Sequence, residues 1–198
     1  TDLSSHYRLM QAAVEVDSAK PFFNVAQIPR SIVGLTLSLT DACRTPRGFS
    51  GGGGIIAFPS RKALAFHFEF TPVEAAKLPI HILEFFCMLV AVLIISVMTP
   101  GAVVAEYQDN QAVVFAVQLL RSSDPRFQEG ILLREAILER GKLDSRQEYM
   151  KSELNDVADP ASRNQLQTRR KNAKSHGWKI EAELNRIALV QLIPDFEM

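Results

Sequence analysis

The sequence predicts an α/β domain built on a mixed sheet. Segments with strand-like alternation and segments with helix-like apolar spacing follow one another in the order β-β-β-α-β-α-α-β-α. The chain has 198 residues, which is enough for one domain with appendages and a sizeable core. Its 47% apolar and 22% charged residues are ordinary globular usage.

Three strands are predicted in the first half of the chain. Residues 32–39 alternate between two faces, and residues 54–58 and 63–70 are short apolar runs joined by a turn that contains Pro59. Residues 44–54 contain five glycines and one proline, so we expect a loop there. Asp41 stands between the first strand and this loop.

A connector over residues 71–79 leads into a long apolar helix, residues 80–98. From Phe85 to Met98 only Ser96 is polar. A membrane span needs about 20 apolar residues. This run is shorter and starts directly after Glu84, so we predict a core helix enclosed by the sheet and other helices. A membrane anchor formed by Phe85 to Met98 is the alternative.

The second half begins with a short strand, residues 102–107, which ends at Asp109. Helices are predicted over residues 110–120 and 127–140, a last strand around residues 148–150, and a final helix over residues 179–192. We divide the chain into a lead-in (residues 1–30), a main domain (residues 31–163) and a basic C-terminal extension with a terminal helix (residues 164–198).

Charge and cysteine usage say little about function. The formal net charge is zero, so the distribution of charge matters more than its sum. Between Arg163 and Lys179 there are six basic residues and no acid. That stretch is either a solvated surface or a contact for nucleic-acid backbone. Cys43 and Cys87 are predicted to be free thiols in a reducing, intracellular compartment.

Three carboxylates, Asp41, Glu84 and Asp109, are predicted to meet at one edge of the sheet. Two follow strands, and the third lies in the first turn of the apolar helix. If the two strands are neighbours, their last residues lie about 5 Å apart. Carboxylates gathered so closely repel each other unless a cation neutralises them, and Mg²⁺ with oxygen ligands is the commonest solution. Two such ions can activate a water and stabilise the leaving oxygen of a phosphodiester.

Each acid also has an ordinary structural explanation. Asp41 could form a turn, Glu84 could favour the helix dipole, and Asp109 with Asn110 could cap a helix. Asp156 and Asp159 could be loop or capping acids. The joint pattern favours a metal site.

The order and spacing of these acids resemble the ribonuclease H domain of a retroelement (LTR- or DIRS-like) reverse transcriptase polyprotein. The likeness covers residues 35–163. Four motifs carry it: Thr40-Asp41-Ala42 followed by glycines, Pro79-Ile80-His81-Ile82-Leu83-Glu84, Asp109-Asn110, and Asn155-x-x-Ala158-Asp159-x-x-Ser162-Arg163. The last motif selects Asp159 over Asp156 as the fourth acid.

The resemblance implies a ribonuclease H-like fold, with a mixed five-stranded sheet and helices on both faces. It implies endonucleolytic cutting of the RNA strand of an RNA–DNA hybrid with two Mg²⁺ or Mn²⁺ ions. The implied ligands are Asp41, Glu84, Asp109 and Asp159. The implied partners are nucleic acid and an upstream reverse transcriptase domain, without a membrane. The expected nucleic-acid contacts are Asn110, Arg163, Arg169, Arg170, Lys171 and Lys174.

One departure from the family pattern concerns proton transfer. No histidine stands in the segment before the fourth acid, where residues 146–149 read Arg-Gln-Glu-Tyr. We therefore expect water to protonate the leaving group. The principal alternative function is a non-catalytic domain of the same fold that serves as a scaffold or nucleic-acid-binding module.

Overall fold

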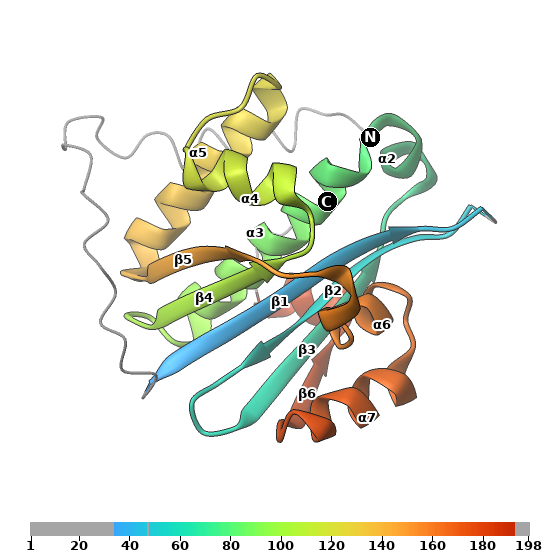
Figure 1. Cartoon of the computed structure of the whole chain (residues 1–198), viewed down its shortest axis with the longest axis vertical. Helices are drawn as coiled ribbons and strands as arrows, with labels where there is room; N and C mark the ends of the chain where they lie inside the picture. Colours follow the sequence, from blue (N-terminus) through green and yellow to red (C-terminus); the bar gives the residue numbers. More distant parts are fainter. Residues whose placement is uncertain (1–33, 47, 193–198) are drawn as a thin grey trace.

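A six-stranded mixed sheet forms the centre of the domain, in the order β5-β4-β1-β2-β3-β6 (Figure 1). The computed structural model describes residues 34–46 and 48–192, so the predicted lead-in lies outside the described residues. The strands are β1 (Leu35–Arg44), β2 (Ser50–Ala57), β3 (Lys62–Glu69), β4 (Val103–Gln108), β5 (Asp144–Tyr149) and β6 (Lys179–Leu184).

β1, β2 and β3 form an antiparallel meander, whereas β4, β5 and β6 run parallel to their neighbours. The α/β class with a mixed sheet is confirmed, but the predicted count of five strands is wrong. The sixth strand, β6, comes from the C-terminal segment for which a helix over residues 179–192 was predicted. Instead β6 pairs with β3, and the helix there, α8 (Arg186–Leu192), is shorter.

The glycine-rich segment is a strand and not the predicted loop. β1 continues through Asp41 to Arg44, and residues 51–54 pair with it as the first half of β2. All of β2 is buried, with helices on both faces. Four consecutive glycines have no side chains that could alternate between polar and apolar. For this reason the sequence pattern indicates a loop.

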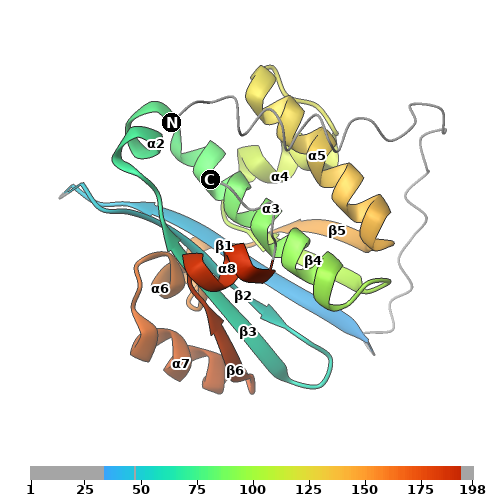
Figure 2. The same cartoon turned by 180° about the vertical axis from the view of Figure 1, so that it is seen from behind.

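Helices cover both faces of the sheet (Figures 1 and 2). One face carries α3 (Ile80–Met98), α4 (Gln111–Gln118), α5 (Pro125–Gly141) and α8; the other carries α6 (Ala158–Ser162) and α7 (Leu166–Ser175). Helix α3 packs against β1, β2 and α5. It is long and apolar enough to cross a membrane, yet most of its residues are buried inside this domain, as predicted for a core helix.

The predicted connector over residues 71–79 contains a helix, α2 (Pro72–Lys77). Its N-terminus is a capping box: the Thr71 side chain accepts a hydrogen bond from Glu74 N (3.2 Å), and Glu74 Oε2 accepts one from Thr71 N (2.6 Å). Helix α2 therefore leads the chain from β3 into α3 by a defined path.

Candidate metal centre

Asp41 lies in β1, and Asp109 directly follows β4, the neighbouring parallel strand. The pairing of β1 with β4 reaches Leu39 and Tyr107, and each acid lies two residues further along its chain. Odd-numbered residues of β1 face α6 and α7, whereas Ala42 faces α3. Strand β4 ends at Gln108, so the sheet is open on the β4 side of Asp41, whereas Gly53 of β2 pairs with Asp41 on the other side.

Glu84 reaches this opening from α3, on the other face. Two polar neighbours fix its surroundings. Asn110 Nδ2 donates a hydrogen bond to Glu84 Oε2, while Asn110 Oδ1 caps α4 by accepting from Ala112 N (3.0 Å) and Val113 N (3.3 Å). Gln108 Nε2 donates to the Glu84 backbone oxygen (3.1 Å) and to Thr40 Oγ1 (2.7 Å). The end of β4 is thereby tied to Thr40 in the middle of β1 and to the beginning of α3.

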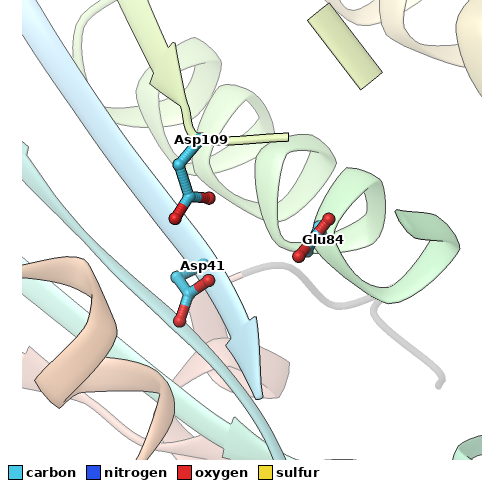
Figure 3. A group of neighbouring side chains, drawn as sticks. All are labelled: Asp41, Glu84 and Asp109. Carbon is cyan, nitrogen blue, oxygen red and sulfur yellow. The ribbon is translucent and has the colours of Figure 1, made fainter. Parts of the chain in front are cut away.

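One carboxylate oxygen from each of Asp41, Glu84 and Asp109 lies within 4.8 Å of the other two (Figure 3). Burial raises the pKa of Asp41 to about 7, helped by the charges of Asp109 and Asp159 and opposed by a hydrogen bond from Ser162. Burial also raises the pKa of Glu84 to about 7, with Asp41 and Asp109 contributing and the Asn110 bond opposing. The protein alone does not neutralise this cluster.

The donor set fits a hard divalent cation. All three side chains offer carboxylate oxygens, the ligands that Mg²⁺ and Mn²⁺ prefer, and they are close enough to share an ion. A bound cation would replace the protons that Asp41 and Glu84 otherwise hold near neutral pH. Perturbed acids gathered in this way are characteristic of functional sites.

Asp159, the fourth predicted acid, does not belong to this close group. It lies in the first turn of α6, and both Nε and Nη2 of Arg163 approach its Oδ1 at 2.8 Å. Its charge still acts on Asp41, whose pKa it raises. The structure thus brings together three of the four predicted ligands and holds the fourth nearby in an ion pair.

The predicted nucleic-acid contacts fall into three groups. Asn110 lies inside the centre, where it holds Glu84. Arg163, Arg170, Lys171 and Lys174 are exposed, although Arg163 is paired with Asp159 and Arg170 with Glu183. Arg169 is only 1% exposed and pairs with Glu183 at 3.1 Å. Arg169 is therefore absent from the surface along which a nucleic-acid backbone would lie, and that expectation is corrected.

A cavity of about 460 Å³ opens beside the acids. Its lining includes Glu84, Asp109, Asn110, Gln111, Tyr149 and Ser152. Sequence reasoning did not single out Tyr149 or Gln108. For Gln108 a signal existed, since it directly precedes the predicted ligand Asp109 at the end of a strand; in the structure its side chain has no exposed surface. For Tyr149 the sequence offered no signal, because the last strand was predicted only approximately, around residues 148–150, and β5 spans Asp144–Tyr149.

No protein-family model and no curated protein matches the sequence. Solved structures do match. LC11-RNase H1, isolated from compost by a metagenomic approach, aligns with a TM-score of 0.55 at 17% identity, over 67% of this chain and 99% of that one. RNase H1 from the archaeon Halobacterium salinarum aligns with a TM-score of 0.50 at 13% identity, over 68% and 98%.

The chain has a ribonuclease H-like fold. A foamy viral protease–reverse transcriptase, solved in complex with an RNA/DNA hybrid, is also similar, with a TM-score of 0.51 at 10% identity. That match covers 76% of this chain and 22% of the viral one. LC11-RNase H1 has likewise been solved in complex with an RNA/DNA hybrid. The predicted fold is confirmed, and the extra strand β6 is the difference from the expected sheet.

Proposed function

We propose that this chain is a metal-dependent endonuclease that hydrolyses the RNA strand of RNA–DNA hybrids. One observation carries the proposal: Asp41, Glu84 and Asp109 converge within 4.8 Å in a ribonuclease H-like fold. The structures similar to this chain include two that hold an RNA/DNA hybrid. Cleavage of nucleic acid would account for both the group of three acids and the likeness to structures that hold a hybrid.

Asp41, Glu84 and Asp109 would hold two Mg²⁺ or Mn²⁺ ions, with Asp159 as a fourth ligand once it leaves Arg163. When bound, the ions supply activation of water and stabilisation of charge on the phosphate. The residues of the chain set the geometry. Asn110 and Gln108 fix the start of α3, Ser162 holds Asp41, and the open cavity beside Asp109 leaves space for the scissile phosphate.

Partners and location belong to the same proposal. Exposed Arg163, Arg170, Lys171 and Lys174 provide positive charge beyond the centre for a nucleic-acid backbone. The likeness to a viral protease–reverse transcriptase supports an upstream reverse transcriptase domain in a retroelement polyprotein. The two cysteines are free and buried, which suits an intracellular protein. Because most of α3 is buried inside the domain, we do not propose this helix as a membrane anchor.

The deciding experiment offers labelled hybrid, duplex DNA and duplex RNA to the purified chain, with Mg²⁺ or with EDTA. We expect cleavage of the RNA strand of the hybrid with Mg²⁺ alone, and its loss in Asp109→Asn. Asp156→Asn is the matched control. Asp156 lies near the fourth acid but pairs with His176 (2.9 Å), so this variant should keep activity. Wild-type cleavage rates in Asp109→Asn would disprove the assignment.

A non-catalytic scaffold of the same fold is the second candidate. The ion pair that holds Asp159 favours it, because one expected ligand is engaged elsewhere. The two candidates differ in metal dependence. A competent centre binds the ion only when folded, so Mg²⁺ or Mn²⁺ should raise the unfolding temperature of the wild type and leave Asp109→Asn unchanged. A scaffold without a metal centre should show no such shift.

A further inference from the structure

Ser162 lies against the centre from the face opposite α3. It is the last residue of α6, has no exposed surface, and donates a hydrogen bond from Oγ to Asp41 Oδ2 at 2.7 Å. Among the described residues, this hydroxyl is the hydrogen-bond donor to the Asp41 carboxylate. Asp41 Oδ2 is therefore engaged in a hydrogen bond within the protein.

The position of Ser162 is fixed independently of this bond. Its backbone oxygen accepts a hydrogen bond from Cys43 Sγ at 3.2 Å, and α6 rests on β2 where the strand has no side chains. A Cβ at Gly51 would lie 2.2 Å from Ser162 O, and one at Gly53 would lie 2.8 Å from the Ala161 carbonyl carbon. These contacts leave α6 little freedom to shift across the sheet.

The hydroxyl has two acceptors and one proton. Besides Asp41 Oδ2, the backbone oxygen of Asp159 lies 2.9 Å from Ser162 Oγ. A charged acceptor at 2.7 Å forms the stronger bond, so the proton belongs with the ionised carboxylate. The bond holds the Asp41 carboxylate at the point where it meets the carboxylates of Asp109 and Glu84.

We propose that Ser162 is a positioning residue for metal binding: its hydroxyl fixes the rotation of the Asp41 carboxylate and leaves the second oxygen for the cation. The inference rests on the proposed function, because it takes Asp41 as a ligand. Partners that orient a ligand from behind commonly change metal affinity about 10–100-fold when they are removed. Ser162 therefore sets the affinity of the centre, in addition to packing α6.

The test measures the Mn²⁺ dissociation constant of the substrate-free protein, from the spin-resonance signal of free Mn²⁺ at a fixed pH of 8. Ser162→Ala removes the donor. Ala161→Gly is the control: it loosens the same helix and removes a buried methyl group, but keeps the hydroxyl. Unfolding temperatures in EDTA are recorded for both, so that stability and affinity are separated. Ser162→Cys, kept reduced, has a similar volume and a weak donor, and it serves if the alanine variant does not fold.

We expect Mn²⁺ affinity to fall about tenfold or more in Ser162→Ala, less in Ser162→Cys, and not in Ala161→Gly, although all three unfold earlier than the wild type. In an Asp41→Ala background, Ser162→Ala should have no further effect on affinity. Wild-type affinity in Ser162→Ala, or an equal loss in Ala161→Gly, overturns the inference alone. Absence of Mn²⁺ binding to the wild type overturns both the inference and the proposed function.

Discussion

Asp41 and Asp109 lie close together, each two residues beyond the paired Leu39 and Tyr107 of the parallel strands β1 and β4. Because β4 stops at Gln108, no strand pairs with Asp41 on that side, whereas Gly53 of β2 pairs with it on the other. Glu84 reaches the same point from the opposite face. The centre is thus built where a parallel strand ends next to a strand that continues. This arrangement buries the side chains of Asp41 and Glu84.

The first prediction concerns pH and stability in EDTA. Asp41 and Glu84 have folded-state pKa values raised to about 7, while their unfolded values are near 4. The folded state therefore binds more protons than the unfolded state between these limits, and stability falls as pH rises. We expect the free energy of unfolding to be higher at pH 6.5 than at pH 8, by about 1 kcal/mol for each group. Denaturant titration at both pH values measures it.

A substitution isolates the contribution of the centre. Asp41→Asn should be more stable than the wild type at pH 8 in EDTA, and its stability should change less between pH 8 and pH 6.5. His67, whose pKa is lowered by burial and by Arg169, acts in the opposite direction near pH 6.5, where the unfolded chain takes up its proton. Because His67 is present in both proteins, its contribution cancels when the wild type and Asp41→Asn are compared. Equal pH dependence in the wild type and the variant would contradict the assigned cause.

The second prediction concerns the glycines of β2. In Gly51→Ala the new Cβ would meet the Ser162 backbone at 2.2 Å, so α6 must move away from Asp41. In Gly52→Ala the nearest atom is Cys87 Sγ at 2.5 Å, on α3. We expect each to cost about 1–3 kcal/mol, as overpacking usually does. Hydrogen exchange measured by mass spectrometry should show faster exchange in α6 for Gly51→Ala and not for Gly52→Ala. Identical patterns in the two variants would show that the faces of β2 are not independent.

These glycines also show why sequence reasoning fell short. Strand prediction relies on alternating side chains, and Gly51 to Gly54 have none. Glycine is needed at these positions because helices pack closely on both faces of β2, and the packing of these helices is known only from the fold. The acids were easier, because strand ends and the head of an apolar helix are visible in the pattern. Asp41, Glu84 and Asp109 were therefore brought together as expected.

The missed elements had two different causes. Helix α2 had a readable signal, since Thr71-Pro72-Val73-Glu74 has the spacing of a capping box, but its short length gave no periodicity. Strand β6 had no such signal. Its Glu181 and Glu183 pair with Lys62, Arg169 and Arg170 of other elements, so its stability comes from tertiary contacts. The spacing of residues likewise does not decide whether Asp159 joins the other acids or pairs with Arg163.

The last prediction tests the basic surface of α7. Lys171 and Lys174 are exposed, and we expect them to lie near phosphates of a bound hybrid. Each phosphate contact contributes about 0.9 to the slope of log K against log salt. Replacing both lysines by alanine should therefore make the slope less negative by about 1.8 and weaken binding at low salt. Fluorescence anisotropy in EDTA, with hybrid at several salt concentrations, measures this without cleavage.

Arg140→Ala is the control for that experiment, because Arg140 is exposed on α5, on the opposite face of the sheet. Its removal changes the net charge of the chain but should leave the slope as it is. A change in Arg140→Ala half as large as in the double lysine variant, in proportion to the single charge removed, would mean that the hybrid senses only overall charge. An unchanged slope in the lysine variant would place the nucleic-acid path away from α7, since a contact that releases no counterions is not a phosphate contact.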